Sequence, residues 1–275
     1  MNVSNFSQKV LFKTWIISLL IFYHFTGFGQ EILPPEPYGG NRLLKEFIRE
    51  EMIYPDIALQ HKTEGTVVLS FIVTSIGEVR NTEVVQRVSD ALDREAIRIF
   101  KKILWYPATE IGIPIDYKYS FEIKFDIDKY LKLVKKRGYE HYAFPYEPVD
   151  TSEVVYKMLD VDQTPRPVYD SKNFNFSSFI ANNLEYPEAA FKQNISGVVQ
   201  LHFVVEPSGR ISNIVVEKAL GGGCTEEAIR VIKLVKWNPG ILDGMAVRTF
   251  MCTDITFNIA KHTVEGVIPN PGQIH

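Results

Sequence analysis

The sequence predicts an α+β protein made of two tandem domains, each with the order helix–strand–strand–helix–strand. The segment from residue 47 to 127 recurs from 179 to 259, offset by 132 residues, without a gap and with 24 of 81 positions identical. Both copies contain the alternation of apolar and polar residues that is typical of half-buried strands, and both contain apolar residues at helical spacing. A repeat this long, present twice, indicates two whole domains, because solenoid units are only about 20–50 residues long.

Strands are expected where apolar residues alternate with polar ones and a turn sequence follows. Glu206-Pro207-Ser208-Gly209 predicts a hairpin turn, and Ser75-Ile76-Gly77 predicts its counterpart in the first copy. The clearest alternation lies at the end of the first copy, where aromatic residues alternate with polar ones. The expected strands are residues 66–73, 79–85 and 115–127 in the first copy, and 198–205, 211–216 and 247–259 in the second. They predict a three-stranded antiparallel sheet in each domain.

The helices are expected on one face of each sheet. Tyr54-Pro55 and Tyr186-Pro187 each precede a short helix, since proline is favoured in the first helical turn, where its missing N–H has no partner. The expected helices are residues 56–61 and 92–104 in the first copy, and residues 176–183, 188–194 and the segment from Cys224 to Trp237 in the second. Two helices packed on one side of a three-stranded sheet form a two-layer α+β sandwich.

The chain divides into five expected segments. Residues 1–29 are interpreted as a signal peptide, because a short apolar run comes after Lys9 and Lys13 and because Gly27 and Gly29 precede Gln30. The apolar run, residues 15–28, is shorter than the roughly 20 residues of a membrane-spanning helix. The alternative is that it stays as an inner-membrane anchor. The other expected segments are a first domain at 30–127, a linker at 128–161, a second domain at 162–260 and a loose tail at 261–275.

Composition argues against several function classes. Removing residues 1–29 changes the net charge from −3 to −5, and no basic patch with interleaved aromatic residues stands out, so we expect no nucleic-acid partner. The six histidines have no metal-ligand or catalytic spacing, and we expect neither an enzyme nor a metal or cofactor site. Cys224 and Cys252 are expected to be free thiols, with a disulfide as the alternative, and Cys252 is expected on the solvent face of its strand.

The order of the motifs in each copy resembles the C-terminal domain of TonB. The motifs are Tyr-Pro before a short helix, a Gly-x-Val strand, a glycine turn, Glu-Ala-Ile-Arg, Trp-x-Pro and a final Ile-x-Phe. The second copy matches more closely, with Gly209-Arg210-Ile211, Gly221-Gly222-Gly223 and Trp237-Asn238-Pro239-Gly240, and the first copy lacks the glycine loop. The resemblance covers about 170 of the 275 residues.

The resemblance implies a periplasmic protein that binds the TonB-box peptides of outer-membrane transporters, or other envelope proteins, and so takes part in transmembrane transport. The last strand of a sheet that begins with a hairpin lies at an edge, and an extended peptide can pair with its free N–H and C=O groups. The implied peptide-binding residues are Thr249, Phe250, Met251, Cys252, Thr253, Asp254, Ile255, Glu185 and Tyr186 in the second domain, and Tyr119, Ser120, Phe121 and Tyr54 in the first.

Two alternatives remain open. The chain could be a membrane-anchored energy transducer if residues 15–28 are retained, although residues 30–46 extend only about 55–60 Å. It could instead be a structural or assembly module whose sheets pair edge to edge, within the chain or in a homodimer, without a peptide ligand.

Overall fold

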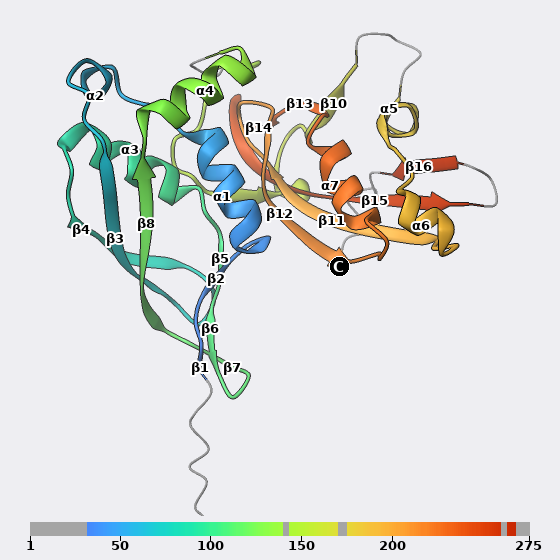
Figure 1. The fold of residues 1–275 in the computed structure, drawn as a ribbon, viewed down its shortest axis with the longest axis horizontal. Helices are drawn as coiled ribbons and strands as arrows, with labels where there is room; N and C mark the ends of the chain where they lie inside the picture. The colour runs from blue at the N-terminus through green and yellow to red at the C-terminus, as the bar shows by residue number, and fades with distance from the viewer. Residues whose placement is uncertain (1–31, 140–142, 170–174, 260–262, 268–275) are drawn as a thin grey trace, which may run out of the picture. The chain divides into compact units, whose positions relative to one another are not determined.

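The structure, a computed structural model, describes residues 32–139, 143–169, 175–259 and 263–267 of the 275-residue chain (Figure 1). The expected signal peptide at 1–29 and part of the expected tail lie outside these residues. Within the described ranges, the structure contains no helix that is both long and apolar enough to cross a membrane. The described residues form two domains, each with its own hydrophobic core.

The first domain is built on a three-stranded antiparallel sheet. Strands β3 (Gly65–Val73), β4 (Val79–Gln86) and β8 (Tyr117–Phe125) are arranged in the order β4-β3-β8. The central strand sends its alternate residues into the core, where they are fully buried: Val67, Leu69, Phe71 and Val73. The strand pattern expected for this domain is therefore confirmed.

The helices of the first domain that the structure describes are α1 (Gly40–Glu51), α2 (Asp56–Gln60), α3 (Asp90–Lys101) and α4 (Ile127–Arg137). Helix α2 comes directly after Pro55, as expected. Helix α3 starts two residues earlier than expected, because Ser89 accepts a hydrogen bond from the Leu92 N–H and caps its first turn. It also ends three residues earlier than expected. Sequence analysis missed α1, and α4 occupies part of the expected linker.

Short strands complete the first domain. Strand β1 pairs with β6 and β6 with β7, while β2 pairs with β5. Their bounds are β1 (Ile32–Leu33), β2 (Glu36–Pro37), β5 (Trp105–Tyr106), β6 (Ala108–Glu110) and β7 (Ile113–Ile115). The segment before α1 is thus folded back onto the segment after α3.

The second domain repeats this plan with a larger sheet. Its counterparts of β3, β4 and β8 are β11 (Gly197–Val205), β12 (Ile211–Lys218) and β15 (Met245–Asn258). Its helices are α5 (Phe176–Asn183), α6 (Glu188–Lys192) and α7 (Cys224–Ile232). The remaining elements are β9 (Val155–Lys157), η1 (Met158–Asp160), β10 (Arg166–Val168), β13 (Lys236–Asn238), β14 (Gly240–Leu242) and β16 (Thr263–Val267).

The two domains have the same register at the offset of 132 residues. Gly65 pairs with Phe125, and Gly197 pairs with Phe257. The β3–β4 hairpin and the β11–β12 hairpin also contain register shifts at equivalent positions. The turn glycines Gly77 and Gly209 have φ values of 84° and 74°. A Cβ on Gly77 would lie 2.6 Å from the Trp105 carbonyl oxygen, so the turn needs glycine for conformation and for space.

The expected three-stranded sheet is wrong for the second domain. Its sheet has six strands, because β14, β9 and β16 all pair with β15 in addition to β11. Figure 1 shows β16 as a short arrow beside β15. Residues 263–267 were expected in a loose tail, and β9 lies in the expected linker. Both segments are short, and both pair with β15. Strand β16 follows β15 closely in the chain, whereas β9 lies far before β15 in the sequence.

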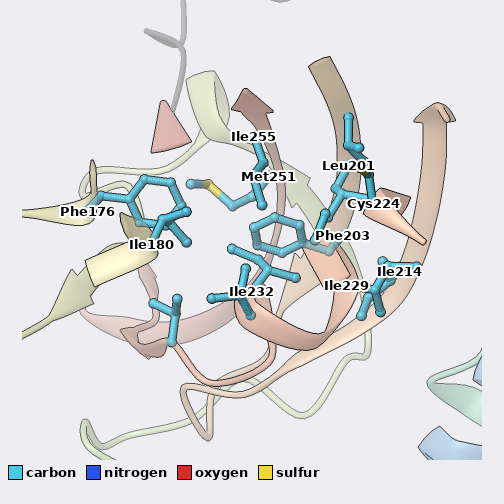
Figure 2. Close-up of a cluster of buried hydrophobic side chains, with 14 of the residues drawn as sticks. Phe176, Ile180, Leu201, Phe203, Ile214, Cys224, Ile229, Ile232, Met251 and Ile255 are labelled. Carbon is cyan, nitrogen blue, oxygen red and sulfur yellow. The ribbon is translucent and has the colours of Figure 1, made fainter. Parts of the chain in front are cut away.

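The core of the second domain lies between its sheet and helices α5 and α7 (Figure 2). Phe203 of the central strand lies in the middle of this cluster, with Met251 of β15 and Ile232 of α7 close to it (Figure 2). Phe176 and Ile180 of α5 close one side. This packing holds β15 rigidly in place, as the equivalent cluster does for β8.

Candidate functional site

Strand β8 is a bare sheet edge in the described part of the chain. It pairs with β3 along its whole length, from Phe125 to Tyr117, and with no other described strand. Ser120 in its middle is exposed, whereas Tyr119 and Phe121 are half-buried. Both rings make edge contacts with Trp105, at centroid distances of 5.9 and 5.8 Å. The aromatic contacts pack the inner face of β8, and no described strand pairs with the backbone groups on its outer side.

Strand β15, the equivalent of β8, is covered on its outer side. Arg248 to Phe250 pair in parallel with β9, and Asp254 to Asn258 pair in antiparallel fashion with β16. The expectation that this strand lies at a sheet edge is therefore wrong for Thr249, Phe250, Asp254 and Ile255. Met251, Cys252 and Thr253 lie between the two pairings and are buried.

Tyr54 and Tyr186 are brought close to the ends of the last strands, although neither is a free surface residue. The Tyr54 hydroxyl donates to the Thr63 carbonyl at 2.6 Å, and the Tyr186 hydroxyl donates to the Ile195 carbonyl at 2.5 Å. Their rings make edge contacts with Phe125 and Phe257, respectively. Burial, with the negative charges of Glu64 and Asp126, raises the pKa of Tyr54 to about 12. Each tyrosine ties the loop after a short helix to the last strand.

The side chain of Glu185 is exposed, and it is the backbone of Glu185 that bonds to helix α7. The Glu185 N–H donates to Glu227 at 2.6 Å, and the Ile53 N–H donates to Glu95 at 2.8 Å in the first domain. Glu95 and Glu227 belong to the repeated Glu-Ala-Ile-Arg motif, and each also pairs with the arginine three residues later. The motif therefore fixes the Tyr-Pro segment to α3 or α7.

The two domains are joined by a polar cluster that sequence analysis missed. Arg248 of β15 and Glu206, both 3% exposed at the side chain, form an ion pair at 3.0 Å. The Arg248 guanidinium also donates a hydrogen bond of 2.8 Å to the Lys102 carbonyl at the end of α3. Asn213 donates to the same carbonyl at 2.9 Å and accepts from the Leu104 N–H at 2.9 Å. Thus side chains of the second domain cap a helix of the first.

The sequence did contain a signal for this cluster. At the offset of 132 residues, Glu206 corresponds to Thr74 and Arg248 to Asp116, so a buried ion pair exists in only one of two otherwise equivalent positions. In the first domain, Asp116 accepts from the Ser75 N–H in an exposed turn. Charged residues that are present in one copy and replaced in the other indicate a role specific to that copy.

A second ionic cluster lies beside the first and belongs mostly to the first domain. Glu51 is buried, and it accepts from Arg98 at 2.6 Å and from Lys102 at 2.8 Å. Burial pushes the pKa of Glu51 upward, but the charges and hydrogen bonds of Lys102 and Arg98 outweigh it, so the pKa of this carboxyl is lowered.

Helix α1 provides further contacts between the domains. Glu50 pairs with Arg210 and with Lys233 of the second domain, both at 3.1 Å. Leu43 of the same helix belongs to the hydrophobic core of the second domain. Together with the Arg248 cluster, these contacts join the two domains of the described chain.

The cysteines and acidic residues do not form a chemical centre in the described residues. Cys224 and Cys252 are free and buried, so the expectation that Cys252 faces solvent is wrong. Burial raises the pKa of both thiols, which lowers their reactivity. No group of three or more His, Cys, Asp or Glu residues able to hold a metal ion is found where the structure describes the chain.

Comparison with known proteins identifies the repeated unit. The family model described as the Gram-negative bacterial TonB protein C-terminal matches residues 50–127 and 182–259, which together make up more than half of the chain. No curated protein matches the chain. Domains of this family are non-catalytic, act in the periplasm and have a role related to TonB-dependent transport. The chain therefore belongs to the TonB C-terminal domain family and carries two tandem copies of that domain.

Proposed function

We propose that this chain is a periplasmic TonB-like protein whose first domain binds an extended, TonB-box type segment of an outer-membrane transporter by pairing it with β8. One observation carries the proposal, namely the difference between two equivalent strands. Among the described residues β8 pairs with β3 alone, whereas the outer side of β15 is occupied by β9 and β16. The first domain thus offers the docking edge.

The geometry of β8 suits strand addition. Every second residue of an edge strand turns its N–H and C=O groups away from its neighbour, and an extended peptide can satisfy them. The nine-residue pairing of β8 with β3 has no register shift. The opposite edge, β4, has two register shifts and places Asn81 at a φ of 52°, which makes it a poorer template.

The roles predicted for Tyr119, Ser120 and Phe121 depend on this docking mode. Ser120, together with Lys118 and Glu122, lies on the exposed face of β8, where it would meet the side chains of the added strand. Tyr54 would act indirectly, by holding the Phe125 end of β8 in position. The equivalent role of residues 249–255, Glu185 and Tyr186 requires that β9 and β16 first leave β15.

Hydrogen exchange of the full-length chain, with and without a TonB-box peptide, tests the proposal. We expect the peptide to slow exchange at alternate amides of β8 and to leave the β15 amides unchanged, because other strands already pair with the outer side of β15 at residues 245–250 and 254–258. The equivalent strand therefore serves as an internal control. A peptide of the same sequence with N-methylated alternate residues should bind at least tenfold more weakly, since it keeps its side chains but loses half of its backbone donors.

Two results would count against strand addition at β8. One is protection that appears at β4 or β15 instead of β8. The other is equal affinity for the methylated and unmethylated peptides, which would mean that side chains alone carry the binding. Affinity weaker than about 1 mM for every TonB-box peptide, a free energy of only about 4 kcal/mol, would also contradict the proposal.

The anchored energy transducer has less support. A transducer anchored in the inner membrane must reach across the envelope to the transporter. Residues 30–46 would cover about 55–60 Å of that distance only if they were fully extended. Residues 32–37 and 40–51 instead form β1, β2 and α1, which belong to the folded domain. The residues 15–28 that would form the anchor lie outside the described residues.

Pairing between two copies of the chain uses the same observation as peptide docking. The bare edge of β8 could pair with β8 of a second copy instead of with a peptide. In that case the β8 amides of the free protein would be protected in a concentration-dependent manner, and sedimentation velocity would detect a dimer. A monomer with fast-exchanging β8 amides favours peptide docking.

A further inference from the structure

A large open groove lies where the two domains meet. Its volume is about 870 Å³, and its walls come from α1 and α4 of the first domain and from α7 of the second, with Arg210 from the β11–β12 turn. Because both domains supply walls, neither domain contains this groove by itself. It is also separate from the β8 edge, since no residue of β8 lines it.

The groove is strongly basic, although the chain is slightly acidic. Its lining includes nine Lys and Arg residues and three Glu residues, a net charge of +6, whereas the whole chain carries 30 Lys and Arg against 33 Asp and Glu. Glu50 is neutralised by Arg210 and Lys233 inside the groove. Arg42, Lys132 and Lys136 are exposed and have no carboxylate within ion-pairing distance among the described residues.

The apolar residues of the groove narrow the choice of ligand. Leu234, in the turn just after α7, is 48% exposed, and Leu133 of α4 is half-buried in the opposite wall. A flat lipid surface fits a hollow poorly, because it cannot reach cations on three different helices at once. An extended chain can enter the hollow, place carboxylates against the cations and lay apolar side chains on the leucines.

We propose that this groove binds an acidic, leucine-containing extended segment of a partner protein. The segment lies between α4 and α7, with its carboxylates near Arg42, Lys132 and Lys136. The potential of the groove attracts the segment and speeds its association, and salt weakens binding. The second domain thereby has a task that does not need a free strand edge. It supplies one wall of a composite site.

Fluorescence anisotropy with the full-length chain and a labelled peptide tests this proposal. The probe contains alternating Glu and Asp around two Leu residues and is about twelve residues long, roughly 40 Å when extended. Its neutral twin has Gln and Asn in place of Glu and Asp. We expect the acidic probe to bind and the double variant K132E/K136E to bind it at least tenfold more weakly. The variant K135E makes one such charge reversal on the same helix outside the groove lining, half the change in net charge of the double variant, and we expect it to bind within twofold of the unchanged chain.

Several outcomes would overturn the proposal. One is a loss of binding free energy in K135E that is at least half the loss in K132E/K136E, which would indicate a response to net charge alone. Binding of the neutral twin as tightly as the acidic probe is another. Phosphatidylglycerol vesicles that bind through Lys132 and Lys136 while the probe does not would point to a membrane instead. Urea unfolding checks that the variants fold, and because β8 lies elsewhere, their affinity for a TonB-box peptide should be unchanged whether or not the groove binds the probe.

Discussion

Single residues of the repeated motifs perform the same structural task in both domains. The hydroxyl of Tyr54 and that of Tyr186 bond the carbonyl nine residues later, and both rings pack against the last phenylalanine of their domain. Glu95 and Glu227 likewise hold the backbone just before these tyrosines. The identical positions of the repeat therefore include residues that fix a loop as well as core residues such as Leu69 and Phe71, whereas a charged position that differs, such as Arg248, makes a contact specific to one domain.

The lowered pKa of Glu51 makes the stability of the first domain depend on pH. Because its folded pKa lies below the unfolded value of about 4.3, Glu51 contributes stability above that value and loses it as pH falls through the folded pKa. We expect the free energy of unfolding to fall as the pH drops below about 5, and to fall less steeply in E51Q. Urea unfolding at several pH values measures this.

The control for this prediction is E83Q on β4. Glu83 is exposed, and it forms no ion pair within the described part of the chain. This variant should keep the slope of the unchanged chain. An E51Q protein with that same slope would show that other carboxyls determine the acid sensitivity.

At the scale of elements, edge strands distinguish the two domains. After β8 the chain enters helix α4, which Asp126 caps by accepting from the Lys129 N–H at 3.0 Å. After β15 the chain returns as β16 and pairs with it. The same strand in the same register is thus left bare in one domain and covered in the other, because the next element is a helix in the first domain and a strand in the second.

Removing the cover should create a second docking edge. We expect a chain that lacks residues 261–275 to expose the outer side of β15 at residues 254–258 and, if β8 binds a TonB-box peptide, to bind two peptides instead of one. Calorimetric stoichiometry and hydrogen exchange at β15 measure the two effects. The exchange result does not depend on the peptide, so it tests the covering role of β16 separately.

A point variant gives the same test without truncation. A Cβ on Gly266 would lie 2.6 Å from the Ile180 side chain and 2.8 Å from that of Phe176, so G266V should keep β16 from its place. Faster exchange of the β15 amides is expected in both variants. Unchanged exchange in both would mean that β16 does not protect the edge.

At the scale of the whole molecule, the two domains are tied mainly by charged side chains that the first domain lacks at the equivalent positions, namely Arg248, Glu206 and Arg210. Arg248 links the Glu206 carboxylate with the end of α3, while Arg210 and Lys233 reach α1. The first group is buried and the second is partly exposed. The buried group should therefore carry most of the coupling.

Replacing Arg248 by methionine tests this coupling. We expect R248M to lower the free energy of unfolding by about 3 kcal/mol, because the buried Glu206 carboxylate then keeps the Ser212 hydroxyl as a hydrogen-bond donor but has only the more distant Lys102 as a cation among the described residues. R210M should cost about 0–1 kcal/mol, since its ion pair is partly exposed. Urea unfolding measures both, and the double variant R248M/E206Q should recover much of the loss. Equal losses in R248M and R210M would contradict the greater weight of the buried pair.

Local patterns in the sequence predicted the central strands and several helices of each domain. Strand alternation predicted β3, β8 and β11 to within about two residues, and α5 matches its predicted bounds. These elements depend on residues close together in the chain, so the pattern contains the information. Helix α1 was missed because its residues align only in part with the repeat, which begins at Phe47.

The sequence by itself therefore determined the family, the duplication, the hairpin turns and the central strands of each copy. Only the tertiary structure decided which edge is bare and how the domains are joined. Strand β9 reaches β15 from more than ninety positions away, and Arg248 reaches the Lys102 carbonyl across 146. The two strands differ in pattern, because β8 alternates half-buried aromatic residues with exposed polar ones, whereas β15 is buried along most of its length. Which segments pair with the outer side of β15 depends on backbone groups that are distant in the sequence, as for β9, and a pattern within the strand does not identify them.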